Sequence, residues 1–116
     1  MSGKKIALIT GGASGIGKGM GLQLLKRGLH TLVIWDVNES LMQSTAHEFK
    51  EAGYRVQIYK LDVMNTEEVI HTAQKVKQDV GKIDILINNA GIIVGKIFMD
   101  HTHEDIDKTM GINTNQ

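Results

Sequence analysis

The segment that most constrains the fold is the glycine-rich run 10–17, which has the sequence Thr-Gly-Gly-Ala-Ser-Gly-Ile-Gly. It follows an apolar, strand-like segment at 6–9 and precedes a stretch with helical periodicity. Glycines let the backbone turn through positive φ and approach a ligand closely, because no Cβ intervenes. A helix that begins at such a turn directs its first N–H groups at an anion. The run therefore predicts a site for a pyrophosphate, with contacts from Gly11, Ser14, Gly15, Ile16 and Gly17.

Strand-like and helix-like segments alternate along the rest of the chain. We expect strands at 5–10, 31–36, 55–61 and 83–88, and helices at 15–27, 39–51 and 66–80. Asn38 and Asn65 are placed to cap two of these helices, and Glu68 completes a capping-box spacing with Asn65. Gly53 and Gly81 mark helix ends. A last helix containing Ile106, Met110 and Ile112 would follow a cap at Asp100 or Thr102.

The expected strands are nearly continuous apolar runs, which is typical of a parallel sheet with helices on both faces. Right-handed crossovers, with a reversal at the first strand, predict the strand order 3-2-1-4 of a partial, doubly wound, Rossmann-like α/β fold. The fourth strand would then be an exposed apolar edge. We therefore expect residues 1–116 to form a single dinucleotide-binding domain that is truncated on its carboxyl-terminal side.

Composition narrows the functional class. The formal net charge is zero, without a long basic or acidic block, so neither nucleic-acid binding nor an anionic membrane surface is indicated. The apolar runs are far too short for a membrane span. The chain has no cysteine, which excludes disulfides and thiolate metal sites. His101, His103 and Glu104 are best interpreted as solvated residues, so we expect no metal site in a soluble, cytoplasmic protein.

Asp36 ends the second expected strand, where a carboxylate can accept hydrogen bonds from both ribose hydroxyls of an adenosine. The same negative charge would repel a 2′-phosphate, so NAD is favoured over NADP. Neither Ser14 nor Val37 supplies a cation for that phosphate, whereas Lys18 lies close enough to weaken the argument. The alternative interpretation is that Asp36 only caps the next helix.

A P-loop is the main competing interpretation of the glycine run. Residues 12–18 fit the pattern G-x-x-x-x-G-K. The next position requires a hydroxyl that holds magnesium, and Gly19 has none. A P-loop NTPase is therefore only a remote alternative.

Taken together, the run 10–17, Asp36, Asp62-Val63 and Asn88-Asn89-Ala90-Gly91 resemble the short-chain dehydrogenase/reductase family in order and spacing over nearly the whole chain. The resemblance implies that Asp62 accepts a hydrogen bond from the adenine amino group and that Val63 gives apolar contact. It implies that Asn88 braces the neighbouring strand, and that Asn89, Ala90 and Gly91 lie at the cofactor. Asn113 falls where the family carries a catalytic asparagine, although beside Gly111 it also suits a helix end.

The family resemblance further implies a catalytic serine and a Tyr-x-x-x-Lys pair, and neither can be placed here. Tyr54 and Tyr59, both expected in a strand, are followed four residues later by Ile58 and Val63. We expect either an NAD-dependent oxidoreductase whose remainder follows Gln116, or a non-catalytic nucleotide-binding or regulatory fragment. The substrate would be an alcohol or carbonyl, and the segment 95–98 resembles the branch that acts on lipophilic retinoids and steroids. A full-length protein is expected to be a homo-oligomer.

Overall fold

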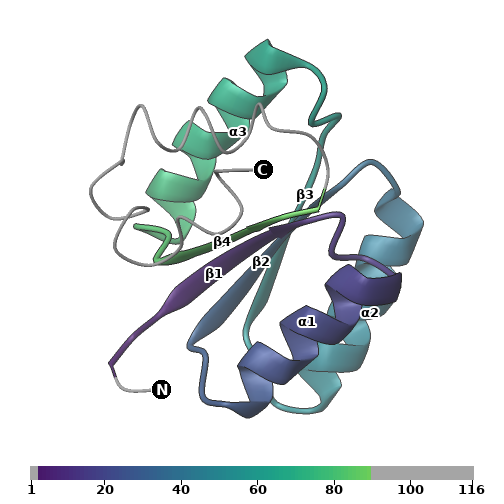
Figure 1. Ribbon diagram of the computed structural model, residues 1–116, viewed down its shortest axis with the longest axis vertical. Coiled ribbons are helices and arrows are strands. Elements are labelled where there is room, and N and C mark those ends of the chain that lie inside the picture. The colour runs from purple at the N-terminus through teal and green to yellow at the C-terminus, as the bar shows by residue number, and fades with distance from the viewer. Residues whose placement is uncertain (1–2, 90–116) are drawn as a thin grey trace.

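The computed structural model describes residues 3–89, which form a parallel four-stranded sheet with helices on both faces (Figure 1). In chain order the elements are β1 (Ile6–Thr10), α1 (Gly15–Lys26), β2 (Thr31–Asp36), α2 (Glu39–Glu51), β3 (Val56–Lys60), α3 (Thr66–Asp79) and β4 (Ile85–Asn88). Each expected element in this part of the chain is present, and its ends differ from the expected ones by at most two residues. The last expected helix lies outside the described residues.

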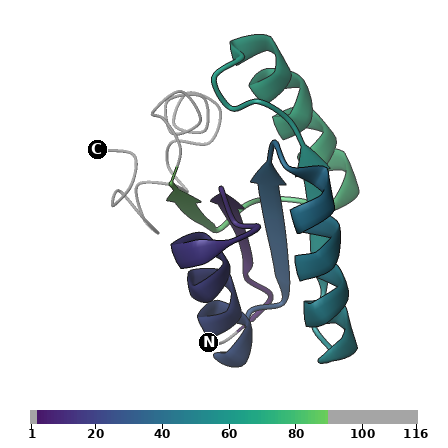
Figure 2. The same ribbon diagram turned by 90° about the vertical axis from the view of Figure 1, so that its right-hand side faces the viewer.

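The sheet has the order β3-β2-β1-β4, which confirms the topology expected from the sequence. All three strand pairs are parallel, and Leu8 of β1 pairs with Val33 on one side and Leu86 on the other. All four strands therefore run toward the same end of the sheet, as the visible purple, blue and green arrows show for β1, β2 and β4 (Figure 2). Because the chain enters each helix from that end, the carboxyl edge of the sheet collects the loops before α1, α2 and α3.

Alternate residues of each strand supply two separate cores, which is why the strands are apolar throughout. On one face α1 and α2 cover a cluster that includes Ile9, Ile34 and Phe49. On the other face α3 covers a cluster that includes Leu8 and Trp35. Both faces are thus closed by helices, and the loops at the carboxyl edge are what the sheet presents to a ligand.

Two asparagines begin helices as expected. The side chain of Asn38 accepts a hydrogen bond from the Leu41 amide at 3.0 Å, and Asn65 accepts one from the Glu68 amide at 3.2 Å. The capping box is only half formed, because the Glu68 carboxylate accepts from the Asp62 amide at 3.4 Å instead of closing back on Asn65. Among residues 3–89 no helix has both the length and the apolar character needed to cross a bilayer.

Candidate cofactor site

The bend between β1 and α1 uses its three spaced glycines in two different ways. Gly11 and Gly15 have φ of +69° and +61°, a region that side chains with a Cβ rarely adopt. Gly17 has an ordinary helical φ but no room for a side chain. A Cβ there would overlap the Gly11 carbonyl oxygen and lie 3.0 Å from Nδ2 of Asn89. The sequence thus requires glycine at two positions for conformation and at one for close approach.

The amino-terminal turn of α1, which follows this bend, is exposed. Ser14 occupies the N-cap position with extended backbone angles, yet its side chain makes no capping hydrogen bond and the first turn has no acidic residue. Ser14, Gly15 and Ile16 are all exposed, and a Cβ built on Gly15 meets nothing within 4 Å. The N–H groups and the positive end of the helix dipole therefore face open space, which suits an anion.

Asp36 lies beside this bend, at the end of β2. Its Oδ2 accepts a hydrogen bond from the Ala13 amide at 3.3 Å, and its Oδ1 accepts one from the Asn38 amide at 3.1 Å. Asn38, not Asp36, caps α2, so the capping interpretation of the carboxylate fails. A carboxylate offers about four lone-pair positions, and two remain for further donors such as a pair of ribose hydroxyls.

The end of β4 is hydrogen-bonded to β1 at the same edge. The buried Thr10 hydroxyl donates to Oδ1 of Asn88 at 2.9 Å and accepts from the Asn89 amide at 2.8 Å. These bonds fit the bracing role that the resemblance implies for Asn88. They also hold Asn89 against the glycine bend. A Cβ added at Gly11 would lie 3.6 Å from the Cβ of Asn89.

Asp62 and Val63 follow β3, next to the strand that ends in Asp36, whose carbonyl accepts from the Leu61 amide at 3.1 Å. The exposed Asp62 carboxylate accepts from the Met64 amide at 2.9 Å. The Val63 side chain is only 8% exposed and packs into the core beneath α3, so little of it faces the edge. The sheet therefore brings Asp62 to the same edge as the bend.

Three expected site residues, Ala90, Gly91 and Asn113, lie outside the described residues, as do His101 and His103. Within the described part of the chain no group of three or more potential metal ligands is found.

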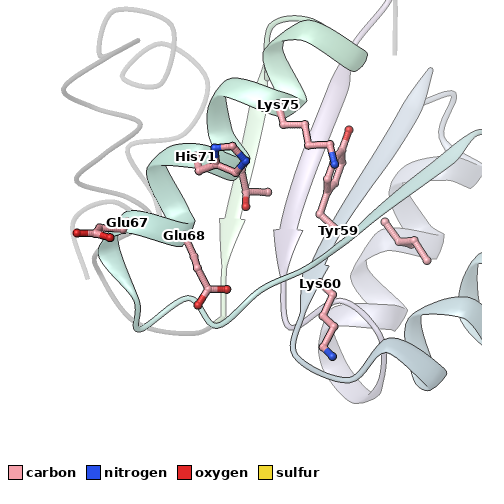
Figure 3. Close-up of a pocket in the computed structure, with 8 residues that line it drawn as sticks. Tyr59, Lys60, Glu67, Glu68, His71 and Lys75 are labelled. Carbon is pink, nitrogen blue, oxygen red and sulfur yellow. The ribbon is translucent and has the colours of Figure 1, made fainter.

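A separate cavity of about 450 Å³ lies between β3 and α3, and it contains none of the expected site residues (Figure 3). Its labelled side chains include Tyr59 from β3 and Lys75 from α3. The Tyr59 hydroxyl donates to Asp79 at 3.0 Å, and burial, followed by this hydrogen bond and the Asp79 charge, raises the pKa of Tyr59 well above its usual range. Tyr59 is therefore poorly suited to donate a proton near neutral pH.

The other tyrosine, Tyr54, was also expected in a strand, but it lies before the start of β3.

Comparison with solved structures supports the fold. The chain superposes on L-sorbose reductase from Gluconobacter frateurii, solved with NADPH and L-sorbose, with a TM-score of 0.71 and 35% identity. That match covers 76% of this chain and 34% of the other. NAD⁺-bound xylitol dehydrogenase gives a TM-score of 0.71 at 26% identity, covering 91% of this chain and 48% of the other.

Sequence comparison supports the same grouping. The chain is 42% identical over 110 residues to epidermal retinol dehydrogenase 2 of Mus musculus, which covers 94% of this chain and 35% of that protein. It thus spans about a third of the length of this relative. A family profile described as short chain dehydrogenase matches residues 5–116. The glycine bend, the carboxylate beside it and these matches place the chain in the short-chain dehydrogenase/reductase family of oxidoreductases.

Proposed function

We propose that this chain binds NAD(H), and that the protein uses the cofactor to move a hydride between an alcohol and a carbonyl. The observation that carries the proposal is the juxtaposition of the open α1 turn with the Asp36 carboxylate, joined through the Ala13 amide. The diphosphate would lie over Gly15 and Gly17, and Ser14 and Ile16 would border it. The bound dinucleotide would supply hydride chemistry, while these residues bind and orient it.

The preference for NAD over NADP rests on the charge of Asp36. Val37 and Ser14 bring no positive charge to this position. The nearby Lys18 is held by Glu48 of α2, with 2.9 Å between Nζ and Oε1. A 2′-phosphate placed at Asp36 would therefore meet a carboxylate, and the Lys18 ammonium is already engaged by Glu48. The charge of Asp36 therefore supports NAD(H). From the family resemblance we also propose Asp62, Val63, Asn89, Ala90 and Gly91 as further cofactor contacts, with only the small exposed part of the Val63 side chain available.

A lipophilic alcohol is the substrate class that we propose, because the similar mouse protein is named as a retinol dehydrogenase. We also propose that Asn113 takes part in catalysis. The second candidate is a non-catalytic nucleotide-binding module, because the described residues at the site are ones that would bind and orient a nucleotide. The family match leaves the P-loop alternative without support.

An NADH fluorescence titration tests the proposal, with NADPH as the competing ligand. We expect saturable NADH binding, and Asp36→Asn should lower the preference for NADH over NADPH by about tenfold, equivalent to about 1.4 kcal/mol. Asp36→Asn removes the charge but keeps an oxygen for the Ala13 amide. Glu51→Gln, at the far end of α2, removes the same charge elsewhere and should leave the preference unchanged.

Two outcomes would contradict these assignments. The absence of any dinucleotide binding would exclude both candidate functions. If Asp36→Asn leaves the preference for NADH over NADPH unchanged, this carboxylate does not discriminate between a ribose hydroxyl and a 2′-phosphate. Turnover of retinol, measured by formation of NADH, separates the enzyme from the non-catalytic module, for which binding without turnover is expected.

A further inference from the structure

The centre of the glycine bend is held by a residue of α2 that no motif contains. The Thr45 hydroxyl donates to the Ala13 carbonyl oxygen at 2.7 Å, across 32 positions of sequence. Both residues are only 2% exposed. A threonine within a helix often bonds a carbonyl of its own preceding turn, so this long-range bond reflects how α2 is placed against the bend.

Ala13 is held on its other side as well, because its amide donates to Asp36. One residue of the bend is therefore fixed from two elements, through its N–H by the end of β2 and through its carbonyl by α2. Ala13 lies between the two positive-φ glycines, Gly11 and Gly15, where the backbone has the most conformational freedom. Its two hydrogen bonds restrain the segment that the glycines would otherwise leave loose.

The two hydrogen bonds of Ala13 also couple the position of the bend to the Asp36 carboxylate. If the Thr45 hydroxyl is lost, the Ala13 carbonyl becomes a buried acceptor without this donor, and the peptide is driven to shift toward another donor. A shift of Ala13 also alters the amide that Asp36 holds. The ion pair between Lys18 and Glu48 joins α1 to α2 nearby, but both side chains are substantially exposed, so solvent weakens it. Thr45 is thus the buried link between α2 and the bend.

We propose that Thr45 is a positioning residue for the cofactor site, which sets the diphosphate-binding bend and, through Ala13, the orientation of the Asp36 carboxylate. This inference rests on the proposed function, since it assigns a role in NADH affinity and in discrimination against NADPH to a side chain of α2. Thr45 does not itself contact the cofactor, and it acts through the backbone of Ala13.

Thr45→Val removes the hydroxyl and keeps the shape of the side chain. We expect NADH binding to weaken by about fivefold to tenfold, comparable to the loss of one hydrogen bond, and the preference for NADH over NADPH to fall. Thr45→Ser restores the donor and should restore both. Thr72→Val is a matched control, because Thr72 is 8% exposed on α3, on the other face of the sheet.

Hydrogen–deuterium exchange of the ligand-free protein gives a readout independent of cofactor binding. In Thr45→Val we expect faster exchange in the bend, residues 11–14, with little change in β3 and α3. Thr45→Ala gives the same comparison if the valine variant does not fold. If the wild-type protein does not bind NADH, the proposed function is overturned. Hydrogen–deuterium exchange would still test whether Thr45 restrains the bend.

The inference is overturned if Thr45→Val leaves affinity, cofactor preference and bend exchange equal to those of Thr72→Val. It is also overturned if Thr45→Ser weakens binding as much as Thr45→Val, since the serine keeps the hydroxyl.

Discussion

The amino-terminal turns of α2 and α3 differ from that of α1 in whether the N-cap side chain accepts a backbone N–H. Asn38 and Asn65 each accept a backbone N–H at the start of α2 and α3, and both first turns contain glutamate. The turn of α1 has a serine that caps nothing and no acidic residue. Donors at a helix start need an acceptor from the protein, from solvent or from a ligand. The fold therefore caps α2 and α3 with their own side chains and leaves the start of α1 without a side-chain cap, which is where we propose that the diphosphate binds.

The same contrast appears in the glycines of α1. Gly17 is buried against the bend, whereas a Cβ on Gly19, two positions later, meets nothing within 4 Å. Glycine weakens a helix wherever it occurs, by roughly 1 kcal/mol relative to alanine. Close packing explains why position 17 is glycine despite this destabilisation. No contact in the structure explains the glycine at position 19.

Gly17→Ala is expected to have the largest effect. The added Cβ overlaps the Gly11 carbonyl and approaches Asn89, so the bend must open. We expect the free energy of unfolding to fall by about 1–3 kcal/mol and NADH binding to be lost. Chemical denaturation and fluorescence titration measure the two effects. Gly19→Ala is the control, and it should stabilise the protein by roughly 1 kcal/mol. Normal binding by Gly17→Ala would mean that the bend tolerates a side chain.

Substitution of the N-cap residues of α2 and α1 should give the next largest effect on stability. Asn38→Ala should lower the free energy of unfolding by about 1 kcal/mol, because the Leu41 amide loses its acceptor. Ser14→Ala should change it by less than about 0.5 kcal/mol, since the Ser14 side chain makes no capping bond. Urea denaturation of the ligand-free variants measures both. Equal destabilisation by the two substitutions would remove the distinction between open and capped helix starts.

Ser14→Asp should give only a small change in stability, but it is the sharpest test of the contrast. A carboxylate at the N-cap supplies α1 with the acceptor and the charge that it lacks, so we expect the ligand-free protein to gain about 0.5 kcal/mol. The same charge opposes a diphosphate, so NADH affinity should fall. Thermal unfolding with and without NADH measures both effects. A stabilised variant with undiminished affinity would show that the anion site lies elsewhere.

Local sequence was enough to predict each element between residues 3 and 89, because the relevant signals act over a few residues. Asn38 and Asn65 cap helices through amides three positions ahead. The apolar strand runs indicated a sheet covered on both faces, and the right-handed crossover rule then gave the strand order. The glycine spacing indicated where the backbone turns.

Contacts across the structure could not be predicted in the same way. Glu68 has the spacing of a capping box, but the path of the loop brings its carboxylate to the Asp62 amide. Lys18 was a candidate cation for a 2′-phosphate, and the packing of α1 beside α2 pairs it with Glu48. Thr45 belongs to no recognised motif, and its role depends on the rotation and position of α2. A hydrogen bond needs its atoms within a few tenths of an ångström, which a residue pattern does not specify.

The sequence by itself determined the order of elements, the two-faced core and the glycine bend, since each depends on hydrophobic period or on the conformational range of single residues. Only the tertiary structure decided that the Ala13 peptide is held between Asp36 and Thr45, and that the N-cap side chain of α1, unlike those of α2 and α3, accepts no backbone N–H. Those features depend on where helices come to rest on the sheet, and that position is set by the packing of many side chains together.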